Sequence, residues 1–478
     1  MASIILPDGR VQAPLNIEAS APSIDLHGFQ WQAVDPIQSP AVNGHLKQQS
    51  KLVDEGKFFN HEAEVAISSA DEDSLPSQVS AQLHLGEPSE GDPQFPLQHF
   101  KGAYTGNGFN LIFRPRASTK GETVVAGEKS DNMLQLGFTT EQISFGHILG
   151  HVPNRGFTNQ SDIELTGVPY MQTIQNTTDP KTAEVSNDKA DIHFEPGVWL
   201  NVPSASIIQD KDNKDPKFPS NDTIVRMASI PHGTTINAQG FVPPRNRDPK
   251  SIIGGFPGKP DFTTKENKAD STPFITGQPN KLIPFDSMKA EASSSLRIPP
   301  DLGNMKGKII STEMIQNPNL VLRNALDKLD VLETIAFKVD TQPSDDLPGG
   351  GTANIAFLTG KQEPKARAVS MKASYWVELV NYPVTVPVLP PFGKIENLAA
   401  VMPNSTAPTP VFTVRAGPGG NKANRKIMVP GIQIQTSQTV LLDFGGLSWP
   451  HISVSTVIPK EQQVVDLDKF PGLENGSK

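Results

Sequence analysis

The chain has 478 residues, with 42 basic and 51 acidic side chains and a formal net charge of −9. It contains no cysteine, which excludes disulfide frameworks, cysteine-ligated zinc, iron–sulfur clusters and cysteine nucleophiles. Its 44 prolines are close to twice the usual share, whereas its 38 glycines are near the average. Because proline breaks helix interiors, a mostly helical fold is not expected. The acidic balance, with no basic stripe, argues against nucleic-acid binding.

The amino-terminal sequence predicts neither export nor membrane anchoring. Its apolar run, residues 4–6, is far too short for the core of a signal peptide and follows no basic region. The chain has no stretch of 18 apolar residues, which a membrane-spanning helix needs. We therefore expect a cytoplasmic protein with no membrane partner.

Polarity divides the chain into three parts. Residues 1–97 are polar and repeatedly interrupted, which predicts an extended arm that packs on the body rather than an independent domain. Residues 461–478 form a polar tail. The segment between them, 98–460, carries the patterns of regular structure.

Short alternating or apolar runs dominate this central segment and predict strands. Pro231-His232-Gly233 separates two of them and predicts a turn. Many short strands joined by proline and glycine turns indicate an antiparallel barrel or sandwich. The runs are Phe109–Phe113, Asn132–Phe138, Gln142–Phe145, Ile163–Leu165, Val168–Ile174, Ile192–Val202, Thr223–Ile230, Thr234–Ala238, Ala336–Asp340, Thr352–Leu358, Val369–Val380, Ile432–Phe444 and Ile452–Ile458.

One helix is predicted, over residues 317–334. Asn317 is its expected N-cap and Pro318 its first helical residue. An apolar face then follows at spacings of four and three, formed by Leu322, Leu326, Leu329 and Leu332. The ordinary interpretation is a helix packed on, or plugging, the barrel.

Several possible sites of chemistry have weak patterns. His147 and His151 have the spacing of a metal pair on a helix, but glycines precede both and Pro153 follows, so no helix is expected there. The glycine-rich segments 349–351 and 417–420 match no phosphate-binding loop, and no G-x-S-x-G elbow occurs. These segments therefore point to no enzyme class.

Two histidines lie in more informative surroundings. His193 lies in the strand pattern of residues 191–199, and His451 lies at the start of the last long strand, in residues 447–457. Taken alone, each is most simply a hydrogen-bonded histidine of a core or a barrel rim.

Five segments, taken in order, resemble the nitrobindin family, whose members are small lipocalin-like β-barrels that bind haem. The first has the form G-x-Y-x-G-x-G where the family has G-x-W-x-G-x-G, and the third has the family's H-x-E-x-G. The segments are Gly102–Phe109, Ile163–Ile174, Ile192–Gly197, Val225–Gly240 and Gln438–Pro459.

The resemblance is scattered over residues 98–460 and departs from the family in two places. Tyr104 replaces the usual tryptophan, and Asn110-Leu111 replaces the Pro-Thr dipeptide after the glycines. The family is also much smaller, so residues 114–160, 203–222, 241–350 and 381–430 are expected as insertions. The implied fold is mainly β, an antiparallel lipocalin-like barrel with long insertions and at least one α-helix.

The resemblance also implies site residues. His451 matches the proximal iron ligand of a haem b, and without a C-x-x-C-H motif this haem would be held non-covalently. His193 matches a histidine on the distal side, and His232 falls at the adjacent turn as a second catalytic candidate. The cofactor-binding positions implied are Leu111, Ile230 and Leu441.

The first hypothesis is therefore a haem-binding barrel with peroxidase-like oxidoreductase activity on a small-molecule substrate. His193 would take a proton from bound peroxide and return it to the leaving oxygen. The resemblance equally implies nitric oxide or peroxynitrite chemistry at the same haem.

Two alternatives remain open. One is a lipocalin-like binder of an apolar small molecule, without haem, in which the insertions form a lid; it would show no Soret band. The other is a structural subunit of a shell or adhesion layer, which would form large oligomers. The reducing substrate and the oligomeric state are left open by the sequence.

Overall fold

The computed structural model describes residues 4–5, 11–12, 95–115, 132–156, 161–178, 185–204, 222–231, 233–243, 258–272, 274–275, 278–282, 310–342, 344, 350–354, 367–403, 407–444 and 447–470. The chain divides into two units, Met1–Ser77 and Gln78–Lys478. In the first unit, β1 (Ile4–Ile5) pairs with β2 (Val11–Gln12) in antiparallel fashion. The rest of the expected arm up to residue 94, and the end of the polar tail, lie outside the described residues.

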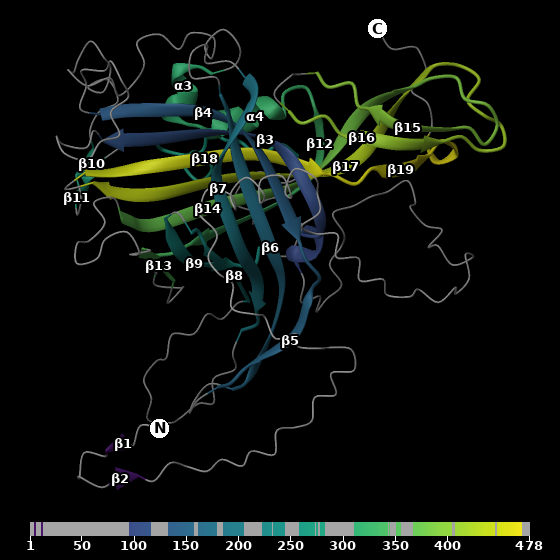
Figure 1. Ribbon diagram of the computed structural model, residues 1–478. Helices are drawn as coiled ribbons and strands as arrows, with labels where there is room; N and C mark the ends of the chain where they lie inside the picture. Colours follow the sequence, from purple (N-terminus) through teal and green to yellow (C-terminus); the bar gives the residue numbers. More distant parts are fainter. Residues whose placement is uncertain are drawn as a thin grey trace, which may run out of the picture. The chain divides into compact units, whose positions relative to one another are not determined.

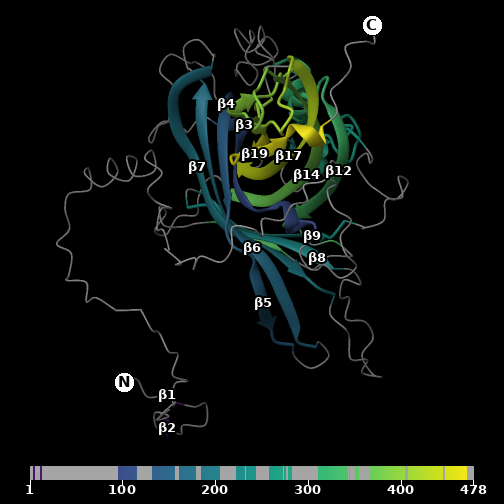
Figure 2. The ribbon, with the colours of Figure 1, turned by 90° about the vertical axis from the view of Figure 1, so that its right-hand side faces the viewer.

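The second unit contains a closed antiparallel barrel. Its neighbouring strands follow the order β3, β4, β6, β7, β8, β9, β12, β14, β17 and β18, and β18 pairs with β3 to close the ring (Figures 1 and 2). The expected antiparallel barrel is thus confirmed. The strands are β3 (Gly102–Pro115), β4 (Asn132–Phe145), β6 (Ile163–Thr178), β7 (Val185–Val202), β8 (Thr223–Ser229), β9 (Thr234–Phe241), β12 (Asp330–Asp340), β14 (Arg367–Val386), β17 (Arg425–Phe444) and β18 (Leu447–Pro459).

Two of these strands come from segments that the resemblance treats as insertions: β4 from 114–160 and β12 from 241–350. The expected turn at residues 231–233 is found between β8 and β9. There the Gly233 amide donates to the Ile230 carbonyl, and the Ile230 amide donates to Thr234. Strand periodicity therefore predicted β4 and β12 correctly, whereas comparison with the smaller members of the nitrobindin family placed both segments in insertions.

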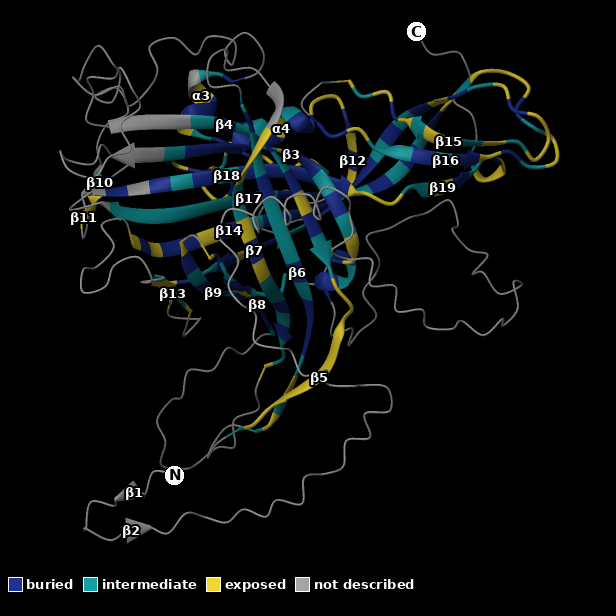
Figure 3. Cartoon of the chain, in the orientation of Figure 1, coloured by how far each residue is buried: buried dark blue, intermediate teal, exposed yellow. Residues whose placement is uncertain are grey.

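The remaining strands extend the sheet or lie beside it. β5 (Leu149–Asn154) pairs with the first half of β6 and is exposed along its length (Figure 3). β13 (Gly351–Asn354) pairs with β9, while β10 (Phe274–Ile275) and β11 (Gln278–Leu282) add to β18. A separate three-stranded sheet contains β15 (Lys394–Ala399), β16 (Val411–Arg415) and β19 (Gln463–Asp466), and the 3-10 turn η3 (Leu467–Lys469) follows it.

An aromatic cluster fills one end of the barrel. The 3-10 turn η1 (Leu97–His99) leads directly into Phe100, whose ring packs edge-on against Trp199 at 5.6 Å. Phe337 stacks on Tyr375 at 5.2 Å, and both rings also lie beside Trp199. Aromatic side chains bury large apolar areas, so this cluster closes one end of the barrel and anchors its inner core.

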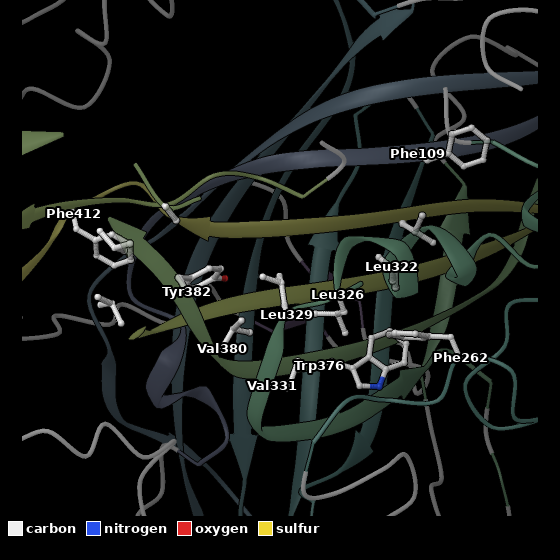
Figure 4. Packing of buried hydrophobic residues seen from close by; sticks show 14 of the residues in the cluster. Phe109, Phe262, Leu322, Leu326, Leu329, Val331, Trp376, Val380, Tyr382 and Phe412 are labelled. Atoms are coloured by element: carbon white, nitrogen blue, oxygen red, sulfur yellow. The ribbon is translucent and has the colours of Figure 1, made fainter. Parts of the chain in front are cut away.

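A second core covers part of the barrel's outer face. The short helices α3 (Thr312–Gln316) and α4 (Asn319–Ala325) pack there over β14, β17 and β18 (Figure 4). Trp376 meets Phe262 edge-on at 5.0 Å, and Leu322 is buried in the same cluster. Since successive residues of a strand face opposite sides, Trp376 packs outside the barrel while its neighbour Tyr375 packs inside.

The predicted helix over 317–334 is wrong in its second half. The helix α4 ends at Ala325, and β12 begins at Asp330. The predicted apolar face is correct for Leu322, Leu326 and Leu329, which are buried together, whereas Leu332 is exposed. Its neighbour Val331 is buried instead, because this part of the chain follows strand rather than helix periodicity.

The expected cap of this helix also has a different role. Pro318, not Asn317, is the N-cap of α4. Asn317 ends α3, donates to the Phe262 carbonyl at 2.9 Å and accepts from the Ala269 amide at 3.0 Å. Its side chain therefore ties the loop over residues 262–269 to the helices. Among the described residues, no helix is long and apolar enough to cross a bilayer.

A buried carboxyl in the outer core predicts a pH-dependent stability. Gln433 donates to one oxygen of Glu378 at 2.6 Å, while the other oxygen has no hydrogen-bond partner among the described residues. Burial raises the pKa of Glu378 from 4.5 to about 8, although the Gln433 hydrogen bond opposes this. Because the folded-state pKa is raised, stability is full below about pH 4 and is lost as the pH rises through 8.

Glu378→Gln is therefore expected to flatten this dependence and to raise the free energy of unfolding at pH 9 by about 1–3 kcal/mol. Urea unfolding at pH 5 and pH 9 measures the difference. An unchanged pH dependence in the variant would show that Glu378 titrates normally in the folded protein.

Candidate functional site

The inside of the barrel contains a small cavity. Its volume, taken as the space open to the centres of water molecules, is about 40 Å³, which is room for about three waters. The wall is formed by Phe100, Asn110, Thr139, Glu141, Ile143, Phe145, Tyr170, Gln172, Ile174, His193, Trp199, Arg226, Tyr375, Ile434, Thr436, Gln438, Ser453, Val454 and Ser455.

A buried ion pair lies in this wall. Arg226 follows the inward alternation of β8, and its guanidinium contacts Glu195 of β7 at 2.5 Å. It also donates to the Tyr170 hydroxyl at 2.8 Å, and to the Tyr375 hydroxyl and Gln438 Oε1 at 2.6 Å each. Tyr170 in turn donates to Glu195. We call these five residues the polar layer; they connect β6, β7, β8, β14 and β17 across the inside of the barrel.

Each member of this ion pair stabilises the ionised form of the other. Burial alone raises the pKa of Glu195, but Arg226 and His193 outweigh burial and lower that pKa to about 2. Burial opposes the charge on Arg226, and Glu195 restores it, so the pKa of Arg226 lies well above its ordinary value. Both groups are therefore ionised near neutral pH.

His193 lies in the wall beside the polar layer. Its Nε2 atom is 3.0 Å from the second oxygen of Glu195, and its side chain is 16% exposed. Neighbouring residues of β7 face opposite sides of the sheet, so Phe194 is 41% exposed whereas Glu195 is completely buried.

Glu141 and Asn110 bring two further polar groups into the wall. Gln172 donates to Oε1 of Glu141, whereas Oε2 of Glu141 and Oδ1 of Asn110 are buried without a hydrogen-bond partner among the described residues. Burial raises the pKa of Glu141, although hydrogen bonding by Ser455 and Gln172 and the nearby charges of His193 and Arg226 lower it. The cavity thus offers acceptors that the protein itself leaves unused.

His451 lies on the same inner face of β18 but outside the cavity wall. The ladder between β17 and β18 has no register shift, and Val457 and Ser455 face the interior. Residues two apart share a face, so His451 faces inward about 7 Å beyond Ser453 along the strand.

The two histidines lie on the same side of the polar layer. Arg226 joins Glu195 to Gln438, and Gln438 pairs with Ser453. His193 is two residues beyond Glu195 in the direction away from Trp199, and hence away from the aromatic end of the barrel. His451 is likewise two residues beyond Ser453, in the direction away from inward-facing Val457.

The apolar residues expected at the cofactor do not line the cavity. Leu111 packs in the outer core, and Leu441 lies on the face of β17 opposite to Gln438. Ile230 is buried at the turn after β8 without reaching the cavity wall. His232 lies outside the described residues.

The weakly patterned histidine pair does not lie on a helix, since His147 precedes β5 and His151 belongs to it. His151 contacts Glu164 at 2.7 Å on an exposed surface. In the described part of the chain, no three side chains of histidine, aspartate or glutamate gather in a way that would hold a metal ion.

For the expected haem b, the barrel offers a suitable iron ligand, but its cavity is too small for the porphyrin. A single inward-facing imidazole, His451, is a suitable axial ligand for haem iron. A porphyrin needs a pocket of roughly 300 Å³ or more, so the ring does not fit inside the cavity of about 40 Å³. A bound haem would therefore lie beyond the polar layer, towards His451, with the cavity on its inner side.

Sequence reasoning overlooked most of the polar layer and both unpartnered acceptors. No sequence pattern selected Tyr170, Tyr375, Glu141 or Asn110 as site residues. A usable signal was present on β7, where His193 and Glu195 have the same strand parity as the buried Trp199.

The comparisons with known proteins add little to this geometry. No protein-family model matches the chain, and no curated protein matches it. A solved structure, "Crystal Structure of Rv2717c from M. tuberculosis", aligns with 9% sequence identity and a TM-score of 0.26, covering 77% of this chain and 98% of that chain. At this level of similarity the match carries no argument about fold or function.

Proposed function

We propose that this protein is a haem-binding β-barrel protein with peroxidase-like activity, which holds haem b non-covalently beyond the polar layer. The observation that carries the proposal is the placement of His193 and His451. They come from distant parts of the chain, β7 and β18, and both face inward on the same side of Arg226.

His451 would hold the haem through its imidazole. When bound, the haem would supply the redox chemistry that reduces peroxide. The porphyrin itself would be held by packing, since the sequence has no cysteine to attach it.

His193 would move the proton. The ionised carboxylate of Glu195 lies 3.0 Å from Nε2 and accepts a hydrogen bond from it. This contact would orient the ring. In the proposed reaction, the other ring nitrogen, Nδ1, would take a proton from peroxide and return it to the leaving oxygen.

The cavity does not favour the alternative of an apolar ligand. Glu141 and Asn110 present unpartnered oxygens to it, and covering them with apolar surface would leave these groups without water or any other donor. Nitric oxide or peroxynitrite chemistry would use the same two histidines as the proposed activity. The absorption spectrum tests haem binding, which all of these activities require.

The proposal is tested by the absorption spectrum of the purified protein after addition of haem. We expect a Soret band at one haem per chain, and loss of haem retention in His451→Ala. His151→Ala, which removes an exposed histidine on β5, is the matched control and should retain haem fully. Full haem occupancy in His451→Ala would show that another residue binds the iron.

His193→Leu separates the proton-transfer role from haem binding. The variant is expected to retain the haem but to react with peroxide roughly 10²–10⁴-fold more slowly, the range of general acid–base catalysis. Stopped-flow measurement of the Soret change after mixing with peroxide gives the rate. An unchanged rate would remove His193 from the mechanism.

A further inference from the structure

The cavity has unpartnered acceptors on two neighbouring strands of the barrel. Glu141 on β4 is 3% exposed and Asn110 on β3 is 5% exposed, and both line the cavity. Oε2 of Glu141 and Oδ1 of Asn110 have no hydrogen-bond partner among the described residues. Leaving such groups unsatisfied is costly, and more so for a charged group, so a bound donor would be favoured.

Two glycines allow the wall to pack closely around these acceptors. A side chain on Gly137 would lie 2.5 Å from Oδ1 of Asn110, so the Asn110 amide occupies the space above this glycine. On the neighbouring strand, a side chain on Gly108 would lie 2.6 Å from the Thr139 hydroxyl and 2.6 Å from the Val454 carbonyl. A larger residue at Gly137 would therefore displace Asn110, and one at Gly108 would clash with Thr139 and the backbone of β18.

The cation in the cavity wall, Arg226, already interacts with other residues of the polar layer. Arg226 contacts Glu195 and donates to two tyrosines and Gln438, and His193 contacts the second oxygen of Glu195. The negative charge of Glu195 is therefore matched within the polar layer. An ionised Glu141, by contrast, has hydrogen bonding from Gln172 and Ser455 and the more distant charges of Arg226 and His193, but no cation in direct contact among the described residues.

We propose that this cavity binds a small ammonium-class cation, such as ammonium, hydroxylammonium or methylammonium, through an N–H donor to Glu141 Oε2, with Asn110 Oδ1, four residues away in the β3–β4 register, as a further acceptor in the same cavity. The size of the cavity, about 40 Å³, admits a group of at most about three non-hydrogen atoms. A small anion is disfavoured, because the unused groups accept rather than donate hydrogen bonds. The proposed haem would lie outside this cavity, and His193 lines the cavity on that side.

The test compares ammonium with potassium, an ion of similar size that has no hydrogen-bond donors. A ligand that binds the folded state alone raises the unfolding temperature with its concentration. We expect ammonium chloride to raise the unfolding temperature of the haem-free protein in a saturable manner, at a fixed pH and ionic strength. Potassium chloride and tetramethylammonium chloride, which is too large and lacks N–H groups, should give no such increase.

Variants locate the effect. Glu141→Gln removes the charge with little change of shape and is expected to weaken ammonium binding about tenfold or more. Glu378→Gln is the matched control, because this buried glutamate also has an unpartnered oxygen but faces the outer core. It should respond to ammonium as the unmodified protein does. Asn110→Ser, which shortens the second acceptor, provides an independent variant if Glu141→Gln does not fold.

Three results would overturn the proposal. An equal response to potassium would show that N–H donors are not what the cavity recognises, and undiminished ammonium binding by both cavity variants would place the site elsewhere. No response to ammonium at all would mean that the cavity holds water alone. None of these outcomes bears on the haem, whose test is the Soret band and the His451→Ala variant.

Discussion

Arg226→Met is expected to lower the free energy of unfolding by about 3–5 kcal/mol, the cost of breaking a buried ion pair on one side. The substitution retains most of the side-chain volume but leaves the Glu195 carboxylate buried without its counter-charge. It also leaves the hydroxyls of Tyr170 and Tyr375 without their shared partner. Urea unfolding at pH 7, followed by tryptophan fluorescence, measures the loss.

The double variant Arg226→Met with Glu195→Gln tests the cause. Because it removes both charges, it should recover part of the loss, since replacing both members of a buried pair is far less costly than replacing one. Arg415→Met, on the exposed part of β16, is the control and should stay within about 0.5 kcal/mol of the unmodified protein. A small effect of Arg226→Met would mean that the polar layer is not dry in solution.

Trp376→Ala is expected to cost a similar amount, about 3–5 kcal/mol, for a different reason. Trp376 is almost completely buried in the outer core, where it packs edge-on against Phe262 (Figure 4). Removing its ring leaves a cavity between β14 and the segment that includes α3 and α4. Thermal or urea unfolding gives the change in stability.

Phe392→Ala is the matched control for this second prediction. Phe392 is also a large aromatic residue, but it is 76% exposed, so its loss should change stability by less than about 0.5 kcal/mol. If Trp376→Ala were equally mild, the outer face of the barrel would be solvated rather than a true second core.

The strand periodicity predicted the barrel because short-range patterns reflect local burial. The last two long strands extend from the predicted Ile432–Phe444 and Ile452–Ile458 by a few residues, and the turn at 231–233 is where the sequence indicated it. The helix over 317–334 was overextended, because leucines spaced three and four apart continue past Ala325 into a strand whose buried residue is Val331.

Local sequence patterns could not predict the polar layer. Arg226 meets Tyr375 across 149 residues and Gln438 across 212 residues of sequence. No local pattern encodes these contacts, which exist because β8, β14 and β17 face one another across a closed barrel. The roles of His193 and His451 in binding haem stay predictions that the spectra described above will test.

The sequence by itself determined that β18 has one apolar face and one polar face, with Ile452 and Val454 alternating with Ser453 and Ser455. Only the tertiary structure decided which face is inside. The isoleucine and valine point outward, because α3, α4 and their loop supply an apolar cover there, and the serines point into the cavity. Leu111, which was expected at a cofactor, packs in this outer core for the same reason. Alternation along a strand determines which residues share a face, but not which of the two faces the rest of the chain covers.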